Sequence, residues 1–413
     1  MKIEAFKTEK QGNVVKVSAE IIWEERDRAK QEIFIETTQE FAEDIFCNPH
    51  AFLLAAIIPA MFYGEKRVFI DASICPKLLE SLTTAMSWLN YWYGKKTQII
   101  PIEAKVQPTP YSFSSFRRAG LFFSGGIDAL AALKTNQLTF PREHPGSIKD
   151  GLLVYGVLGG QNRPDQSFEL VKNAVLKMAK YAGINLIPVT TNIYSHLNDL
   201  DRDFWFWKLH FHGSFFAAIA HAFAHRFHTV SIASTYDLIN LEPWGSHPML
   251  DPNYSSYDLQ IRHENITLSR LSKTKLVSDW EVIYQNLWVC NEISSYKNNQ
   301  LNCGQCEKCV RTMTALLALG ILDKTQVFPN TDVSEELLIK AAKITDSYEE
   351  SCYAELIEPL SLRGREDLVR GIKRIIARYH QTDIQGMIKR VDRQFFQGNL
   401  VNLVKKSNYL IKK

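Results

Sequence analysis

The segment of residues 121–130 strongly constrains the fold of this 413-residue chain, because it joins an apolar strand to an apolar helix through the turn Ser-Gly-Gly-Ile-Asp. Gly125 and Gly126 can adopt positive φ angles and let backbone N–H groups approach a ligand closely. Ser124 adds a hydroxyl group, and the helix N-terminus adds the positive end of its dipole. The segment therefore predicts a strand–turn–helix unit that binds a phosphate-rich anion.

Asp128 indicates how that anion binds. Its carboxylate on the first helical turn would repel a bare phosphate, so a Mg²⁺ ion shared with phosphate oxygens explains its position. An ordinary solvent-facing turn is the alternative, since Ser, Gly and Asp are common at helix starts. We expect an ATP site in which Ser124 and Asp128 act in catalysis. The residues of this segment expected to contact ATP are Phe123, Ser124, Gly125, Gly126, Ile127, Asp128 and Ala129.

Four cysteines form a second motif, with the spacing C-x12-C-x2-C-x2-C: Cys290, Cys303, Cys306 and Cys309. This spacing suits four thiolates around one tetrahedral ion, and Gly304 permits the tight turn that aims backbone N–H groups at sulfur. We therefore predict a structural Zn²⁺ site. An iron–sulfur cluster is the competing interpretation, because ferredoxins also combine closely spaced cysteines with a remote fourth.

Strand and helix patterns alternate from Gly120 onward. Strands are predicted over residues 151–159, 185–190 and 229–233, and helices over residues 167–182 and 207–226. This order predicts a doubly wound parallel α/β sheet, whose ligands bind at the carboxyl ends of the strands. Gly159 and Asn162 follow one predicted strand and are added to the expected ATP site, although they suit an ordinary turn equally well.

Four parts are expected along the chain: an N-terminal α+β accessory domain (1–113), an ATP-binding domain (114–285), a four-cysteine zinc module (286–325) and a helical C-terminal region (326–413). In the first part, strands are predicted over residues 13–23, 31–36 and 67–71, and a helix over residues 76–93. Three prolines between Ile99 and Pro110 oppose helix and central strand, so a linker is expected there.

The glycine turn has neither the lysine of a Walker motif nor the spacing of a Rossmann fingerprint. It resembles the PP-loop of ATP pyrophosphatases. Together with the cysteine motif, which closes with Arg311, it resembles the 7-cyano-7-deazaguanine synthase family over about residues 119–322. The resemblance implies an adenine nucleotide alpha hydrolase-like fold for the PP-loop domain. The chain is longer than the compact synthases at both ends, and Ala129 stands where the family usually has serine.

The resemblance implies a C–N ligase that forms AMP and pyrophosphate while it activates a carboxylate, such as that of 7-carboxy-7-deazaguanine. Ammonia or another amine, including one on a protein, would then give an amide, a nitrile or a conjugate. Residues 244–256 also look like a segment of longer relatives, some of them from antiphage loci. Nucleoside modification and antiphage defence are therefore both open as roles.

Further site residues follow the sheet. Arg270 and Lys273 have an Arg-x-x-Lys spacing that resembles one in the longer relatives, and both cations can neutralise phosphate charge during catalysis. A solvated helix start is the alternative for this pair. Asp237, His247 and Asp251 are expected to bind the substrate, although Asp251 also suits a plain turn before Pro252.

The composition fits a soluble, cytoplasmic enzyme, with 46% hydrophobic and 23% charged residues. The formal net charge of +3 argues against broad nucleic-acid binding, so nucleic acid is not a required partner. The apolar run of residues 51–62 is too short to span a membrane, and no membrane partner is expected. We expect a small carboxylate and an amine as partners, with a homodimer as one option for the assembly.

Two other functions stay open. A tRNA-modifying PP-loop enzyme would use the same ATP chemistry on a base, but Cys47, Cys75 and Cys352 have no partner cysteine at short spacing for sulfur transfer. A non-catalytic ATP-binding module is the second, and Ala129 is the sequence feature that favours it.

Overall fold

The computed structural model describes residues 1–94, 97–109, 117–156, 165–197, 199–201, 204–290 and 300–382. These residues form two compact units. The first unit comprises Met1–Val289, and the second contains Cys290 and the described residues from Asn302 onward. Across the described ranges, no helix combines the length and the apolar character needed to cross a membrane.

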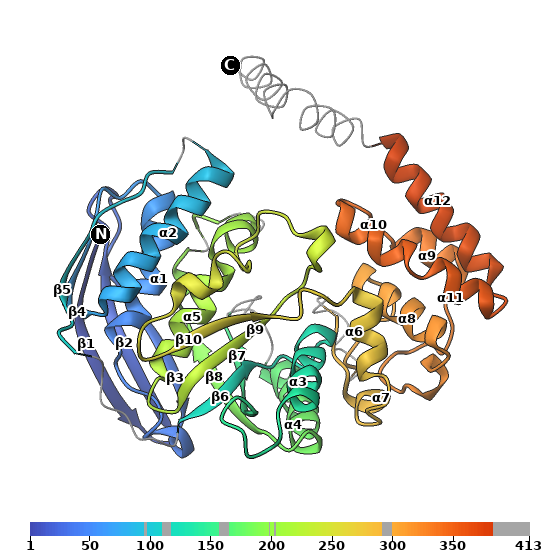
Figure 1. The fold of residues 1–413 in the computed structure, drawn as a ribbon, viewed down its shortest axis with the longest axis horizontal. Helices are drawn as coiled ribbons and strands as arrows, with labels where there is room; N and C mark the ends of the chain where they lie inside the picture. Colours follow the sequence, from blue (N-terminus) through green and yellow to red (C-terminus); the bar gives the residue numbers. More distant parts are fainter. Residues whose placement is uncertain are drawn as a thin grey trace. The chain divides into compact units, whose positions relative to one another are not determined.

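A ten-stranded sheet runs through the first unit in the order β10-β9-β6-β7-β8-β3-β2-β1-β4-β5 (Figure 1). Neighbouring strands pair in parallel except at β8–β3, β3–β2 and β2–β1, which are antiparallel. The expectation of an α/β fold with a mostly parallel sheet is therefore confirmed. In chain order the strands are β1 (Lys2–Gln11), β2 (Val14–Ile22), β3 (Gln31–Thr38), β4 (Val68–Ile74), β5 (Ile102–Val106), β6 (Arg118–Phe122), β7 (Ile148–Tyr155), β8 (Asn185–Thr191), β9 (Phe227–Ala233) and β10 (Gln260–Glu264).

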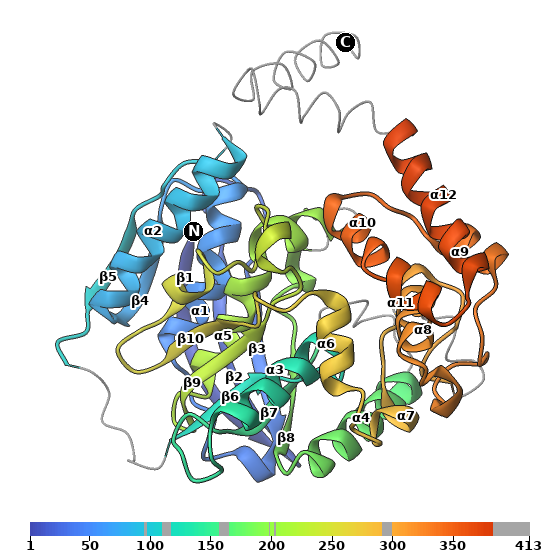
Figure 2. The same ribbon diagram turned by 45° about the vertical axis from the view of Figure 1, so that its right-hand side comes forward.

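The strand order reverses at β6, because β7 and β8 lie on one side of it and β9 and β10 on the other. Helices α3 (Ile127–Thr139) and α4 (Asp165–Tyr181) cover one face, and α5 (His212–Ala222) covers the other (Figure 2). This is the doubly wound arrangement, in which right-handed crossovers leave the central strand in opposite directions. Such sheets bind ligands beyond the carboxyl ends of the strands where the order reverses, here β6 and β9.

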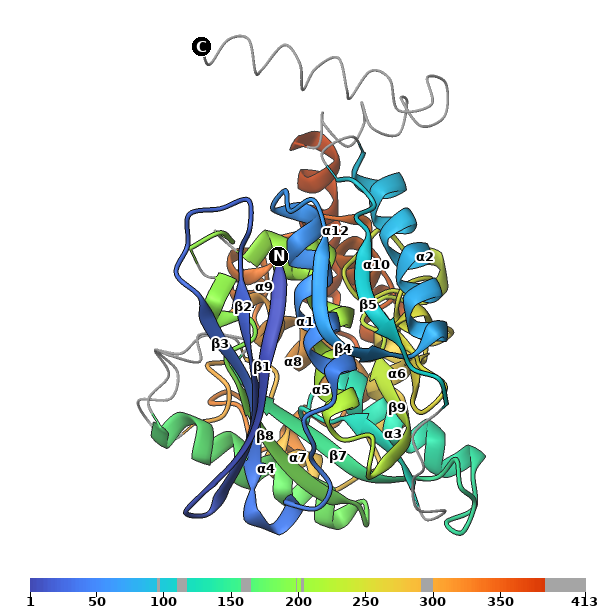
Figure 3. The ribbon, with the colours of Figure 1, turned by 90° about the vertical axis from the view of Figure 1, so that its left-hand side faces the viewer.

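The N-terminal strands extend the same sheet, because β3 pairs with β8 at Ile35–Thr191, Glu36–Thr190 and Thr37–Val189. Helix α1 (Pro49–Phe62) is buried from His50 to Met61 and packs against β1, β4 and α5 (Figure 3). Its side chains and those of the parallel strands belong to one continuous hydrophobic core. The described residues up to 109 thus share a compact unit with the parallel strands, and the four-part division of the chain stays a prediction.

Two segments differ from the expectation. The region expected as a linker contains β5, which pairs with β4 alone at the edge of the sheet, where Pro101 can precede the strand without disrupting a ladder. The segment after Trp244, for which no strand was predicted, contains β10. This strand was not predicted because Ile261 is its only apolar residue, so period-two alternation is absent.

The helix expected over residues 207–226 begins with a π-helical turn, Trp207–Phe211, and α5 ends at Ala222. The backbone of Gly245 causes this irregularity. Its N–H donates to the Lys208 carbonyl (2.8 Å), and its carbonyl accepts from the N–H of Gly213 (2.7 Å). A Cβ atom at this position would lie 2.9 Å from the backbone N of His210, so only glycine permits the approach.

The described part of the first unit also contains α2 (Pro76–Tyr93) near the N-terminal strands, α6 (Arg270–Val277) against α3, and the short α7 (Ile283–Asn286). The second unit is helical over its described residues. Its helices are α8 (Glu307–Leu319), α9 (Glu335–Ala341), α10 (Ser347–Ala354), α11 (Ile357–Leu362) and α12 (Glu366–Thr382). The cysteine motif leads into α8, so the metal site and the helices belong to one unit.

A buried ion pair between Asp150 and Arg226 links the amino ends of the parallel strands. Asp150 on β7 is 0% exposed, and its Oδ1 accepts hydrogen bonds from Arg226 Nη2 (2.7 Å) and Asn185 Nδ2 (2.8 Å). Arg226 also donates to Asp44 (2.6 Å), which follows β3. The network therefore links the parallel strands to the N-terminal part of the sheet.

We predict that Asp150→Asn lowers the free energy of unfolding by about 3 kcal/mol, because it removes the fully buried countercharge of Arg226 and leaves only the partly exposed Asp44. Urea unfolding followed by tryptophan fluorescence measures the change. Glu20→Gln, which breaks an exposed pair with Lys30, is the matched control and should cost less than about 1 kcal/mol. Equal losses in the two variants would contradict the assigned role of Asp150.

Four buried histidines make stability depend on pH. Burial lowers the pKa of His50 to about 3 and the pKa values of His196, His221 and His247 to about 4, from the ordinary value of 6.5. Below pH 6.5 the unfolded chain therefore binds more protons than the folded chain. The contribution of these histidines to the free energy of unfolding is fully present above this pH. It is lost as the pH falls from 6.5 towards the pKa values that the histidines have in the folded chain.

We predict that the urea midpoint falls steadily between pH 7 and pH 5.5. Each of the four histidines can contribute up to about 1.4 kcal/mol per pH unit once its unfolded form is protonated. Urea titrations at several pH values within this window, above the range where carboxylates titrate, measure the slope. A midpoint that stays constant would contradict the burial of these imidazoles.

Candidate functional site

The Ser124–Asp128 loop lies directly beyond β6, at the carboxyl edge where the strand order reverses. Phe123 is buried and its N–H donates to the Leu152 carbonyl on β7 (2.8 Å), which holds the loop against the sheet. Ser124 is exposed, whereas Ile127 is buried beneath the first turn of α3. The fold therefore presents the hydroxyl of Ser124 beside the N-terminus of a helix.

The two glycines of the loop differ in backbone conformation and in the space around their Cα atoms. Gly125 has φ +76°, and a Cβ atom there would come within 2.5 Å of Met178 and 2.9 Å of Val175 on α4. The fold itself therefore requires this glycine. Gly126 has φ −81°, and a Cβ atom would meet no heavy atom closer than 3.5 Å. Packing therefore does not require glycine at this second position. A ligand that approaches the helix N-terminus closely would require it, because a side chain there would obstruct the ligand.

Three charged side chains form a cluster at the end of the loop: Asp128, Arg270 and Lys273. Arg270 Nη1 donates to Asp128 Oδ2 (2.8 Å), and Lys273 Nζ lies 3.3 Å from Oδ1. The exposed side-chain fractions are 24% for Asp128, 13% for Arg270 and 0% for Lys273. Burial alone would raise the pKa of Asp128, but the two cations outweigh it and hold the pKa below its usual range. The cluster therefore carries one net positive charge at neutral pH.

Lys273 joins this charge cluster to the end of β9. Its Nζ donates to the carbonyls of Ser234 (2.7 Å) and Thr235 (3.2 Å), the first residues beyond the strand. Because these carbonyls and Asp128 surround it, the ammonium group is completely buried. The alternative of a solvated helix start is therefore wrong for Lys273. The two strand ends on either side of the reversal are connected through this one side chain.

The three expected substrate residues are held by their own segment. Asp237 Oδ1 accepts from Asn240 Nδ2 (2.6 Å) and caps a short turn. His247 Nδ1 accepts from the N–H of Met249 (3.0 Å). Asp251 is fully buried. Their exposed fractions are at most 8%, so these contacts give each side chain a structural role, and substrate binding stays a prediction. Gly159 and Asn162, expected at the ATP site, lie outside the described residues.

A histidine that sequence reasoning missed completes the environment of Asp251. His263 on β10 lies with Nδ1 2.7 Å from Asp251 Oδ2, and Ser246 Oγ donates to the same oxygen (2.7 Å). The segment between these residues carries no motif that pairs Asp251 with His263 in sequence. The packing of β10 against the short turn Asp251–Tyr254, which includes a hydrogen bond from the N–H of Ile261 to Ser255 Oγ (2.9 Å), brings them together.

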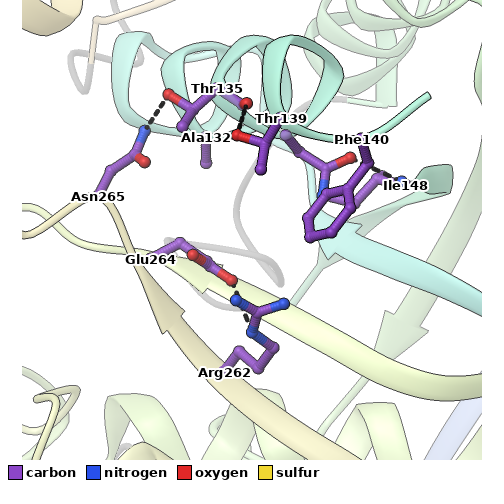
Figure 4. A pocket seen from close by; sticks show the side chains of 9 residues that line it. Ala132, Thr135, Thr139, Phe140, Ile148, Arg262, Glu264 and Asn265 are labelled. Atoms are coloured by element: carbon purple, nitrogen blue, oxygen red, sulfur yellow. Dashed lines mark hydrogen bonds and ion pairs between the residues drawn. The ribbon is translucent and has the colours of Figure 1, made fainter. Parts of the chain in front are cut away.

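A small pocket of about 140 Å³ lies between the C-terminal half of α3 and β10 (Figure 4). In it, Asn265 Nδ2 donates to Thr135 Oγ1 (3.2 Å), and Arg262 Nε lies 2.9 Å from Glu264 Oε1. None of the residues around Asp128 lines this pocket. It is therefore separate from the loop at the other end of α3.

The cysteine motif forms a compact cluster within the second unit. All four sulfur atoms lie within 4.8 Å of one another, with 3.9 Å between Cys290 and Cys306 and 3.8 Å between Cys303 and Cys309. Four thiolates at about 2.3 Å from one tetrahedral zinc ion are separated by about 3.8 Å. The prediction of a group that can hold a metal ion is confirmed. In a four-iron cluster each thiolate binds a different iron and the sulfurs lie farther apart, so the geometry favours a single ion.

Backbone turns and hydrogen bonds position the four sulfur atoms close together. Gly304 has φ +68°, and the turn it makes lets the N–H groups of Gln305 (3.4 Å) and Cys306 (3.2 Å) donate to Cys303 Sγ. The distant ligand is positioned by Asn302, whose Oδ1 accepts from the N–H of Cys290 (3.1 Å). Hydrogen bonding with the Cys290 sulfur is the main cause that raises the pKa of Cys306 to about 12. A bound cation is what allows such crowded thiols to ionise.

We predict that the purified chain contains one zinc ion, and that Cys306→Ser loses it. Elemental analysis measures the metal, and limited proteolysis should show increased cleavage of the second unit, because structural zinc contributes directly to folding. Cys352→Ser, at a buried cysteine outside the cluster, is the control and should keep its metal. Bound iron with a visible absorption band would contradict this assignment.

Comparison with known proteins gives no relative: no family model, no curated protein and no solved structure matches this chain.

Proposed function

We propose that the first unit uses ATP to activate a substrate carboxylate, with release of pyrophosphate, and that an amine then displaces AMP. The observation that carries this proposal is the position of the Ser124–Asp128 loop. It combines an open glycine turn, the N-terminus of α3 and two cations at the point where strand order reverses. Each of these features favours a polyphosphate ligand.

The proposed chemistry needs no covalent protein intermediate. The N–H groups of the loop would bind the β- and γ-phosphates, while a substrate carboxylate oxygen attacks the α-phosphorus. The bond between the α-phosphorus and the bridging oxygen breaks, and its electron pair leaves on pyrophosphate. Arg270 is suited to stabilise this charge, because its guanidinium can bind two phosphate oxygens at once. The amine then attacks the acyl carbon, loses a proton and releases AMP.

Asp128 would hold a Mg²⁺ ion bound with ATP, which neutralises phosphate charge when present. The carboxylate is ionised, with Arg270 at Oδ2 and Lys273 beside Oδ1, so it can hold a metal ion where phosphate groups draw Arg270 away. We assign zinc at the four cysteines a structural role, since four protein ligands leave no open position for a substrate.

The resemblance to 7-cyano-7-deazaguanine synthases supports a 7-deazapurine acid, such as 7-carboxy-7-deazaguanine, as the substrate. Asp237, His247 and Asp251 are the proposed substrate residues. Asp237 follows the end of β9, and Asp251 lies beside His263 near the end of β10, which supports this proposal for two of the three. Ammonia or the amine of another molecule, including a protein, is the acceptor, and the product is an amide, a nitrile or a conjugate. A role in nucleoside modification or antiphage defence belongs to the same proposal, as does a cytoplasmic location.

We predict that Asp128→Asn lowers AMP formation by roughly 100-fold or more, since it removes a charge that orders both cations and metal at the phosphates. The assay combines the protein with Mg·ATP, 7-carboxy-7-deazaguanine and ammonia, and follows AMP and the modified base by mass spectrometry. Asp71→Asn is the control, because this carboxylate is 62% exposed and pairs with the exposed Lys105.

The products discriminate among the candidate functions. AMP formation that depends on the acid supports the ligase. AMP formation that depends on tRNA instead would support a tRNA-modifying enzyme. ATP binding without any turnover, across a panel of carboxylates, would support a non-catalytic binding module.

A further inference from the structure

We propose that Asp128 does not bind a free divalent cation, because Arg270 and Lys273 already pair with both of its oxygens, and that metal enters this site only together with a nucleotide. The inference rests on the proposed function and adds an order of binding to it. It also separates the roles of the two cations, with Arg270 as the side chain that moves and Lys273 as a positioning residue.

Both oxygens of the Asp128 carboxylate are already paired with cations. Arg270 donates to Oδ2 at 2.8 Å, and the ammonium group of Lys273 lies 3.3 Å from Oδ1. A Mg²⁺ ion binds carboxylate oxygens at about 2.0–2.1 Å and keeps most of its own water ligands. Such an ion would therefore share the carboxylate with two positive charges in a largely buried environment. The net positive charge of the cluster repels a free cation and attracts an anion.

The two cations are held differently. Lys273 is completely buried, and the carbonyls of Ser234 and Thr235 hold its ammonium group together with Asp128. Arg270 is 13% exposed and is the first residue of α6. A positive charge at a helix N-terminus opposes the helix dipole, so the stability of α6 does not explain an arginine there. A phosphate group offers this guanidinium a stronger partner than a carboxylate that it shares with Lys273.

Nucleotide and metal therefore bind in a defined order. The triphosphate binds first to the positive cluster and draws Arg270 from Asp128 Oδ2. The released oxygen then becomes available to the metal ion that accompanies the phosphates. By linkage, nucleotide and metal must increase each other's affinity. Throughout, Lys273 holds Asp128 against the ends of β6 and β9 without contacting a phosphate.

The experiment measures Mn²⁺ binding to the full-length, zinc-loaded protein by electron paramagnetic resonance, without nucleotide. The wild-type chain should leave the free Mn²⁺ signal almost unchanged. Arg270→Gln should bind Mn²⁺ at least tenfold more tightly, because one oxygen of Asp128 is released, and adding Asp128→Asn should remove this binding. Arg262→Gln is the matched control, since Arg262 pairs with Glu264 outside the cluster, and it should behave as the wild type.

Two results would overturn the inference: tight Mn²⁺ binding by the wild-type chain that is lost in Asp128→Asn, or no gain of affinity in Arg270→Gln. Arg270→Lys, which keeps the charge, provides a second variant and should resemble the wild type if the charge blocks the metal. A separate titration with ATP, with and without Mg²⁺, tests the proposed function. If ATP binds under neither condition, that function fails, while the Mn²⁺ titration still decides whether Asp128 is blocked.

Discussion

The hydrogen-bonding of β6 between β7 and β9 is the constraint on which the candidate site depends. β7 and β8 lie on one side of β6, whereas β9 and β10 lie on the other side. Because β6 and β9 pair in parallel, their carboxyl ends are neighbours. The Ser124–Asp128 loop follows the first strand, and Ser234 follows the second. Lys273 connects the two by binding Asp128 and the Ser234 carbonyl. A loop that would be an isolated turn in sequence is thereby built into a charged site.

Electrostatics at this edge serves both stability and function. A completely buried ammonium group such as that of Lys273 is tolerated only with close partners, and Asp128 is its countercharge. The same carboxylate is the residue that a nucleotide-bound metal would use. One side chain therefore stabilises the folded, ligand-free chain and takes part in the proposed chemistry, which explains why it is paired rather than solvated.

The four cysteines bear on the stability of the second unit. Three helices of their unit are short, since α9, α10 and α11 have between six and eight residues each. Helices of this length are marginal without tertiary support. A metal ion held by Cys290 and the turn before α8 would supply a fixed point at the start of the unit, and the hydrogen bond to Asn302 and the turn at Gly304 orient the sulfur ligands for it.

The amino-acid sequence by itself determined the features that arise within a short stretch of chain. The glycine turn before α3, the spacing of the last three cysteines and the alternation of strands and helices from Gly120 to Ala233 depend on local φ preferences and periodicity, and they were predictable. Only the tertiary structure decided which of these stretches meet. The pairing of β3 with β8, the pairing of β10 with β9 and the contact of Asp128 with Lys273 join residues far apart in the chain, and the contact of Asp251 with His263 depends on how β10 packs. Such contacts depend on strand order, and the hydrophobic periodicity of a strand does not say which strand it pairs with.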